Sequence, residues 1–215
     1  MSKYVIIALV ILIGAVMTFF LIQYVRFSAS SYGESASAGF FEVLFHKKRR
    51  CEYQVYQILE KEKYSYILAN LCIPDRKHHR KIEIDVLGID ETGLYVFDVL
   101  PHKGHIYGDE KEKKWRQTVK GARKDEFQNP LIRNRVHVNL LRHVVGEQIA
   151  EYCYGFVVFP KDCNIGRLKL SSGVQVVKQS ELQKKIRHMS EGREKVLSQD
   201  ERDKLYSILW GFTNV

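Results

Sequence analysis

Acidic residues on two β-type segments in the middle of the chain could bind a cation. Residues 82–89 alternate apolar and polar side chains, a pattern typical of a strand, and include Asp85. Asp90–Gly93 has the composition of a turn, and residues 94–100 form a second β-rich run that includes Asp98. A hairpin symmetric about this turn would place Asp85 directly opposite Asp98.

Two facing carboxylates repel each other, so this arrangement predicts a partner that offsets the repulsion. A divalent cation such as Mg²⁺ is the natural candidate, because hard cations take carboxylate oxygens as ligands. The alternative is that both carboxylates point to water from a half-exposed sheet, since structural carboxylates outnumber functional ones.

Composition limits the partners and the class of protein. The chain has 215 residues and a formal net charge of +9, which favours anionic partners, either nucleic acid or phospholipid headgroups. The four cysteines lack CxxC spacing, so neither a zinc knuckle nor a redox motif is indicated. Free, partly buried thiols in a reducing compartment are the simpler interpretation, although an even number would permit disulfides outside the cell.

The N-terminal segment is long and apolar enough to cross a membrane. Tyr4–Val25 contains no charged residue, and as a helix it would extend about 33 Å, against a hydrocarbon core of about 30 Å. We therefore expect a transmembrane anchor at residues 1–26, a flexible tether of small polar residues at 27–40, and a folded domain at 41–215. A cleaved signal peptide is the alternative, but the apolar run is too long for a signal core.

The charges that flank this segment bear on its orientation. Lys3 lies on one side, and Arg26 followed by Lys47–Arg50 lies on the other. The positive-inside rule therefore favours a single-pass protein with its soluble domain in the cytoplasm.

The remaining pattern interleaves helices with strands and predicts an α/β domain. A helix is expected within residues 40–63, with Glu52 near its start, and a second within 131–149, opened by Pro130. Further strands are expected at 66–73, 115–117, 154–159 and 174–177, and further helices from Ser180 and from the capping box that begins at Ser198.

Five of these segments resemble the nuclease-related domain (NERD) family. The resemblance covers about Arg49 to Phe159, and its motifs are Cys51-Glu52, Glu83–Val86, Gly93–Leu100, Gly104–Gly108 (a Gly-x-Ile-x-Gly turn) and Asn129–Asn134. Because this family is assigned to the PD-(D/E)XK nuclease fold, the resemblance implies a mixed sheet flanked by helices, preceded here by one transmembrane helix.

The resemblance also implies roles for particular residues. Glu52, Asp85 and Asp98 correspond to the catalytic acids, and Asp85 and Asp98 to the ligands of Mg²⁺. Leu100 stands where the family has its lysine, and Arg133 where it has a glutamine. A leucine cannot transfer a proton, and losing such a group typically slows a reaction about 10²–10⁴-fold. A lysine restored at position 100 is therefore expected to increase cleavage.

Two functions follow from this pattern. The first is a membrane-anchored, Mg²⁺-dependent phosphodiesterase acting on DNA with a degenerate active site. The alternative is a catalytically inactive module that binds nucleic acid or acts as a membrane-tethered interaction domain.

Lys103 could replace the missing lysine only if its loop curled back. The residues expected to contact nucleic acid are Lys103, Lys120, Arg123, Lys124 and Arg133. No small-molecule cofactor is implied.

Overall fold

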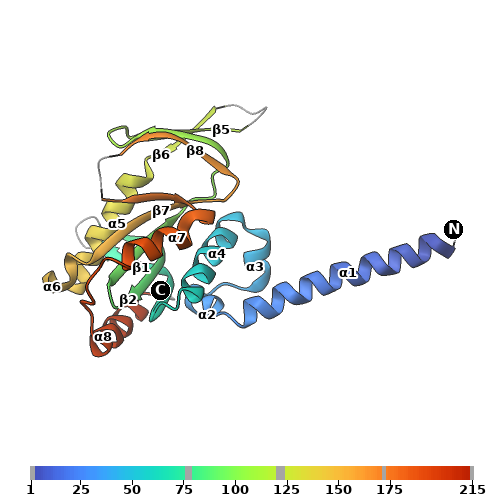
Figure 1. The fold of residues 1–215 in the computed structure, drawn as a ribbon, viewed down its shortest axis with the longest axis horizontal. Helices are drawn as coiled ribbons and strands as arrows, with labels where there is room; N and C mark the ends of the chain where they lie inside the picture. Colours follow the sequence, from blue (N-terminus) through green and yellow to red (C-terminus); the bar gives the residue numbers. More distant parts are fainter. Residues whose placement is uncertain (1–2, 76–78, 120–123, 171–172, 214–215) are drawn as a thin grey trace.

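A mixed five-stranded sheet forms the centre of the domain (Figure 1). The computed structural model describes residues 3–75, 79–119, 124–170 and 173–213. In spatial order the strands of this sheet are β1 (Tyr66–Asp75), β2 (Arg80–Asp90), β3 (Gly93–Val99), β7 (Cys153–Phe159) and β9 (Gln175–Lys178). The first three strands pair antiparallel, whereas β3, β7 and β9 pair parallel.

Helices cover both faces of the sheet, as the sequence predicts. On one face, α4 (Lys47–Lys61) and α7 (Gln179–Ser190) contribute buried apolar residues to one core. On the other face, α5 (Pro130–Val145) and α8 (Gln199–Trp210) contribute to a second core, and the short α6 (Glu147–Ala150) follows α5. The expected α/β class and the mixed sheet flanked by helices are confirmed.

A second sheet of four strands lies beside the first and was largely missed by the sequence patterns. Its spatial order is β6 (Lys124–Gln128), β5 (Lys114–Thr118), β4 (Gly104–Asp109) and β8 (Cys163–Lys169). Only the strand around Trp115 was expected, and the Gly104–Gly108 segment, expected to form a turn, is part of strand β4. Most side chains of β5 and β6 are exposed, so these strands carry little of the apolar alternation that identifies a strand.

The β2–β3 hairpin has the register expected from its sequence. Leu87 pairs with Val96 and Ile89 with Leu94, and the ladder extends as far as Val86 opposite Phe97. Beyond that pair, a side-chain carboxylate takes the place of a backbone acceptor, because the Val99 amide donates to Oδ2 of Asp85 at 2.7 Å.

Both aspartates are buried, with residue exposures of 1% for Asp85 and 0% for Asp98. The alternative of two solvent-facing carboxylates is therefore wrong. Burial on both faces follows from the helices that cover both sides of the sheet.

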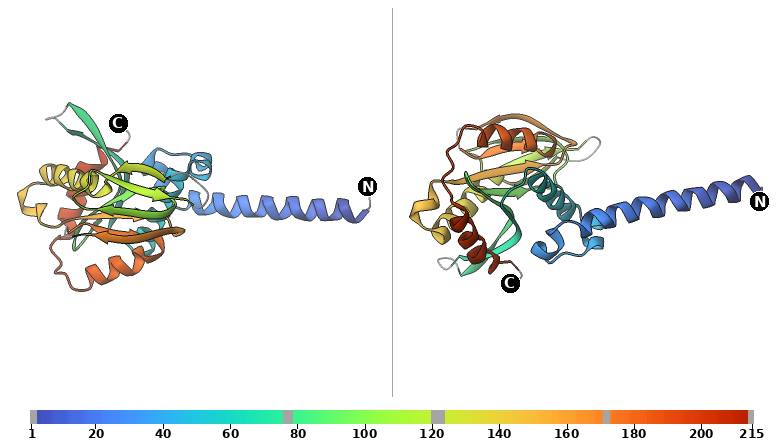
Figure 2. Two further views of the ribbon diagram at one scale, coloured as in Figure 1. Left: turned by 90° about the horizontal axis from the view of Figure 1, so that it is seen from above. Right: turned by 60° about the horizontal axis from the view of Figure 1, so that its bottom comes forward.

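The expected anchor forms one long helix, α1 (Lys3–Ser28), that projects from the domain (Figures 1 and 2). It is long and apolar enough to cross a membrane, and none of its described residues is buried. This helix therefore fits a single-pass membrane anchor, and its lack of buried residues distinguishes it from a core helix. All four cysteines are free thiols, as expected.

The segment expected to be a flexible tether is packed against the domain. It forms α2 (Tyr32–Ala36) and leads into α3 (Phe40–Phe45). The Ala69 amide donates to Oγ of Ser35 at 2.8 Å, and the Asn70 side chain donates to the Ala36 carbonyl at 2.9 Å. The expectation of flexibility is wrong for this part, because these hydrogen bonds hold it against β1.

Candidate active site

Three acidic side chains from two elements converge where helix α4 packs against strand β2. Glu52 comes from α4, and Glu83 and Asp85 come from β2. One carboxylate oxygen of each lies within 4.8 Å of the others. Glu52 and Asp85 are buried, whereas the Glu83 side chain is 44% exposed, so the cluster opens to solvent through Glu83.

The ammonium group of Lys48 lies where these three carboxylates meet. Its Nζ is 2.8 Å from Oδ1 of Asp85, 3.3 Å from Oε1 of Glu52 and 3.5 Å from Oε1 of Glu83. Burial alone would lower the pKa of Lys48, but the charges of Asp85 and Glu52 outweigh burial and raise it. Lys48 is therefore a cation at neutral pH.

In the sequence, Lys48 is one of four consecutive basic residues at 47–50, and nothing in that run distinguishes it from the others. The available signal was its spacing, because Lys48 precedes Glu52 by four positions and so shares its face of the helix.

The second oxygen of Glu52 is held by two donors. Arg49 donates from a guanidinium nitrogen at 3.1 Å, and the hydroxyl of Tyr32 donates at 3.2 Å, both to Oε2. Burial raises the pKa of Glu52, and the charge of Asp85 raises it further. This arrangement directs Oε1 of Glu52 towards Lys48.

Arg133 bridges Asp85 and Asp98. One guanidinium nitrogen lies 3.1 Å from Oδ2 of Asp85 and 3.2 Å from Oδ1 of Asp98. Burial raises the pKa of Asp85, whereas the charges of Lys48 and Arg133 act to lower it. Among the described residues, the repulsion between the two aspartates is thus offset by Arg133 and Lys48.

Both carboxylate oxygens of Asp98 contact side chains of α5. Oδ2 accepts from the Asn134 amide at 2.8 Å, and Oδ1 lies 2.8 Å from Nδ1 of His137 and 3.2 Å from Arg133. Asp98 does not join the convergent group formed by the other three acids among the described residues. Its role as a metal ligand stays a prediction, and it would require Arg133 or His137 to move.

The start of α5 fixes these contacts. Asn129 caps the helix, because its Oδ1 accepts from the Leu131 amide at 2.9 Å, and Pro130 follows at the first helical position. The amide nitrogen of Asn129 also donates to the carbonyls of Asp109, Glu110 and Glu112. Arg133, Asn134 and His137 are therefore placed by a helix end that is tied to the second sheet.

The structure does not bring Leu100 or Lys103 to the acids. Leu100 is only 7% exposed and belongs to an apolar cluster with Trp115 and Phe159. The Lys103 side chain is 54% exposed, and its ammonium lies 3.7 Å from Oδ2 of Asp162.

Of the other expected contacts to nucleic acid, Lys124 is exposed on β6 in the second sheet. Lys120 and Arg123 lie outside the described residues. Among the described members of this set, Arg133 lies at the acids, where it pairs with Asp85 and Asp98.

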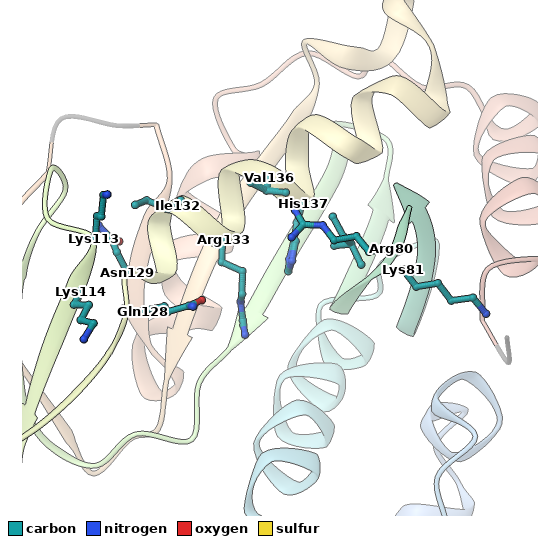
Figure 3. A pocket seen from close by; sticks show the side chains of 11 residues that line it. Arg80, Lys81, Lys113, Lys114, Gln128, Asn129, Ile132, Arg133, Val136 and His137 are labelled. Atoms are coloured by element: carbon teal, nitrogen blue, oxygen red, sulfur yellow. The ribbon is translucent and has the colours of Figure 1, made fainter. Parts of the chain in front are cut away.

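A basic cleft of about 510 Å³ lies beside the acids. Figure 3 shows Lys113 and Lys114 on one side, Arg80 and Lys81 on the other, and Arg133 between them on α5. These basic residues come from three distant parts of the sequence, so local sequence patterns do not predict that they converge.

Comparison with known proteins identifies similarities over the same region. The profile of the nuclease-related domain matches residues 47–160, a range that contains every acidic residue of the site. An uncharacterised protein from Bacillus anthracis is 28% identical over 145 residues, which is 67% of this chain and 65% of that protein. The match thus spans just under two thirds of the relative. No solved structure matches the chain significantly.

Proposed function

The chain belongs to the nuclease-related domain family, and we propose that it is a membrane-anchored, Mg²⁺-dependent phosphodiesterase that acts on nucleic acid. The observation that carries this proposal is the convergence of three carboxylate oxygens on one ammonium group. Acids gathered around one cation beside a basic cleft fit the binding of a metal ion next to a phosphate backbone.

The three convergent acids would hold the cation. Carboxylate oxygens are the ligands that Mg²⁺ prefers, and the ammonium of Lys48 already places a positive charge among Glu52, Glu83 and Asp85. When bound, such a cation supplies charge stabilisation at the phosphate and lowers the pKa of a bound water. Glu83 extends the set expected from the sequence, while Asp98 remains bound by residues of α5.

Lys48 would then act on the substrate. Its side chain is 41% exposed and flexible, so it can leave the acids and reach a phosphate at the mouth of the site. The raised pKa keeps it protonated while it contacts the acids. A lysine ammonium away from these acids is also protonated at neutral pH, so Lys48 would supply positive charge to the scissile phosphate and would not remove a proton from water.

The cleft would hold the flanking backbone. The cleft is lined by basic side chains that end in hydrogen-bond donors, among them Arg80, Lys81 and Lys113. Contacts of this kind bind phosphates with little regard to base sequence, so the binding should weaken steeply as salt is added.

Cleavage of fluorescently labelled duplex and single-stranded DNA by the full-length protein tests the proposal. We expect cleavage that requires Mg²⁺ or Mn²⁺, and Glu52→Gln should reduce it by at least about tenfold, the lower bound for residues that only support a metal ligand, because one of the three acids loses its charge. Glu181→Gln on α7 is the matched control, since Glu181 is exposed and pairs with Lys178 away from the site. Cleavage that survives Glu52→Gln would contradict the assignment.

An inactive nucleic-acid-binding module is the second candidate. The observation that favours it is the guanidinium of Arg133, which already bridges Asp85 and Asp98. The family resemblance also implies that Leu100 stands at the position of the family's lysine. Salt-sensitive DNA binding by a protein that binds Mn²⁺ without cleaving either substrate would support this candidate.

Removal of Lys48 should strengthen metal binding. We expect Lys48→Met to raise the apparent affinity for Mn²⁺ about tenfold, because the metal no longer displaces an ion pair worth on the order of 1.4 kcal/mol. Titration calorimetry on the full-length protein in detergent micelles measures this change. Lys61→Met on the same helix is the control, since Lys61 is exposed at its last turn. An unchanged affinity would mean that the cation binds elsewhere.

A further inference from the structure

Helix α3 presents two large aromatic side chains to solvent. Phe41 is 69% exposed and Phe45 is 73% exposed, and their rings stack with centroids 6.4 Å apart. They are four positions apart and share one face of the helix, whereas Val43 is buried. Exposed phenylalanines grouped on one face indicate a contact surface.

The aromatic pair continues directly from the apolar helix α1. The ring of Phe40 lies 5.4 Å from Tyr24 and 5.9 Å from Phe27, near the C-terminal end of α1, and 5.4 Å from the ring of Phe41. Helix α3 lies on the side of the domain from which α1 projects (Figures 1 and 2). The row of rings therefore begins on the anchor and runs sideways from it.

Charged residues beside this row match a lipid surface. Arg26 follows the apolar run of α1 and is exposed, and Arg50 is exposed just beyond α3. Basic side chains near a bilayer are attracted to anionic headgroups, and aromatic rings are enriched at the level of the headgroups. A protein partner would also accept exposed phenylalanines, but only a bilayer is continuous with α1.

We propose that α3 lies in the headgroup region of the membrane, with Phe41 and Phe45 inserted beside the point where α1 emerges. The domain then has two attachments to the bilayer, the spanning helix and this short amphipathic one. Because α2 packs on β1, both attachments are fixed to the body of the domain. Lys48 lies three positions after Phe45, so the candidate active site is held close to the membrane surface. This proposal is independent of the proposed catalytic activity.

Tryptophan quenching in vesicles tests the proposal. Full-length Phe45→Trp is reconstituted into vesicles of phosphatidylcholine and phosphatidylglycerol, with bromine atoms on the acyl chains next to the headgroups. The wild-type signal of Trp115 and Trp210 is subtracted. We expect the bromines to reduce the fluorescence of the added tryptophan about twofold, because it lies at interfacial depth.

Two matched variants define the comparison. Ile208→Trp places the reporter at an exposed position of α8, on the side of the domain away from α1, and should not be quenched. Met17→Trp places it at an exposed position within α1 and should be quenched most strongly by bromines deeper in the chains.

Quenching at position 45 above the level at position 208 supports the proposal. Equal quenching at positions 45 and 208 would overturn the proposal. If position 17 is still quenched in that case, the membrane anchor is unaffected. Loss of quenching at position 17 would overturn both the anchor and the surface. Dimers that dissociate on Phe45→Ser, with no quenching at position 45, would assign the surface to a second copy of the chain.

Discussion

Replacement of Asp98 by alanine is expected to lower the free energy of unfolding by about 3–5 kcal/mol, the range for breaking a buried ion pair by removing one partner. Asp98 has no exposed surface, and it accepts a hydrogen bond from Asn134 at 2.8 Å. Its other oxygen is 3.2 Å from Arg133 and 2.8 Å from Nδ1 of His137. Without this carboxylate, three buried or half-buried polar side chains lose a partner at once.

Denaturation of the full-length protein in detergent by urea measures the effect. Asp162→Ala is the matched control, because the Asp162 side chain is 53% exposed and its ion pair with Lys103 spans 3.7 Å. A surface pair of this kind contributes between about 0 and 1 kcal/mol. Asp98→Asn should lie between the two, since it keeps the shape and one acceptor. A loss below about 1 kcal/mol for Asp98→Ala would mean that Arg133 and His137 find other partners.

The register of the hairpin that carries Asp85 and Asp98 is predictable from the sequence, because strand periodicity is a local property. The alternation around Asp85 and the turn at Asp90–Gly93 were sufficient to predict the register, which the Leu87–Val96 pair confirms. The same periodicity could not show that helices cover both faces of the sheet. The burial of Asp85 and Asp98 therefore became visible only with the packing of α4 and α5.

The partners of the acids depend on tertiary structure. Arg133 stands far from Asp85 in sequence and reaches it only because Asn129 caps α5 and ties its start to the second sheet. Lys48 and Glu52 are neighbours on one helix, so their contact was predictable from spacing. The contact of Lys48 with Asp85 and Glu83 was not, because it depends on how α4 packs on the sheet.

The packed segment after the anchor shows a different limit of sequence patterns. Ser28–Gly39 is rich in small polar residues, a composition typical of flexible linkers. Yet the Ser35 hydroxyl accepts from a backbone amide of β1, and the Tyr32 hydroxyl donates to Glu52. Composition indicates how freely an isolated segment can move, but the available surface of β1 decides whether it packs.

Leu100→Lys is expected to destabilise the protein by about 3–5 kcal/mol, since it removes a buried leucine and places a charge in an apolar cluster. Leu100 is 7% exposed and packs in the cluster that contains Leu131 and Phe159, and its amide donates to the Val158 carbonyl at 2.9 Å. The sequence alone predicted a gain of cleavage from this change. The packing around Leu100 adds a stability cost that the sequence did not indicate.

Leu100→Met and a double variant separate packing from charge. Leu100→Met should cost less than about 1.5 kcal/mol, because its volume and polarity are close to those of leucine. Arg133→Gln removes the guanidinium that now pairs with Asp98 and Asp85, so a lysine at position 100 could replace it. The double variant with Leu100→Lys should therefore be more stable than the sum of the two single changes predicts.

Urea denaturation and DNA cleavage, measured on the same preparations, decide between these outcomes. If the single Leu100→Lys variant is as stable as the wild type, its ammonium reaches the carboxylates without loss of stability. A lysine at position 100 can then take the place of the family's lysine while Arg133 is present. If it is destabilised and the double variant recovers, Arg133 occupies the place of that lysine. Strictly additive losses would instead mean that position 100 belongs to the core alone, because a side chain that never reaches Asp98 cannot be coupled to Arg133.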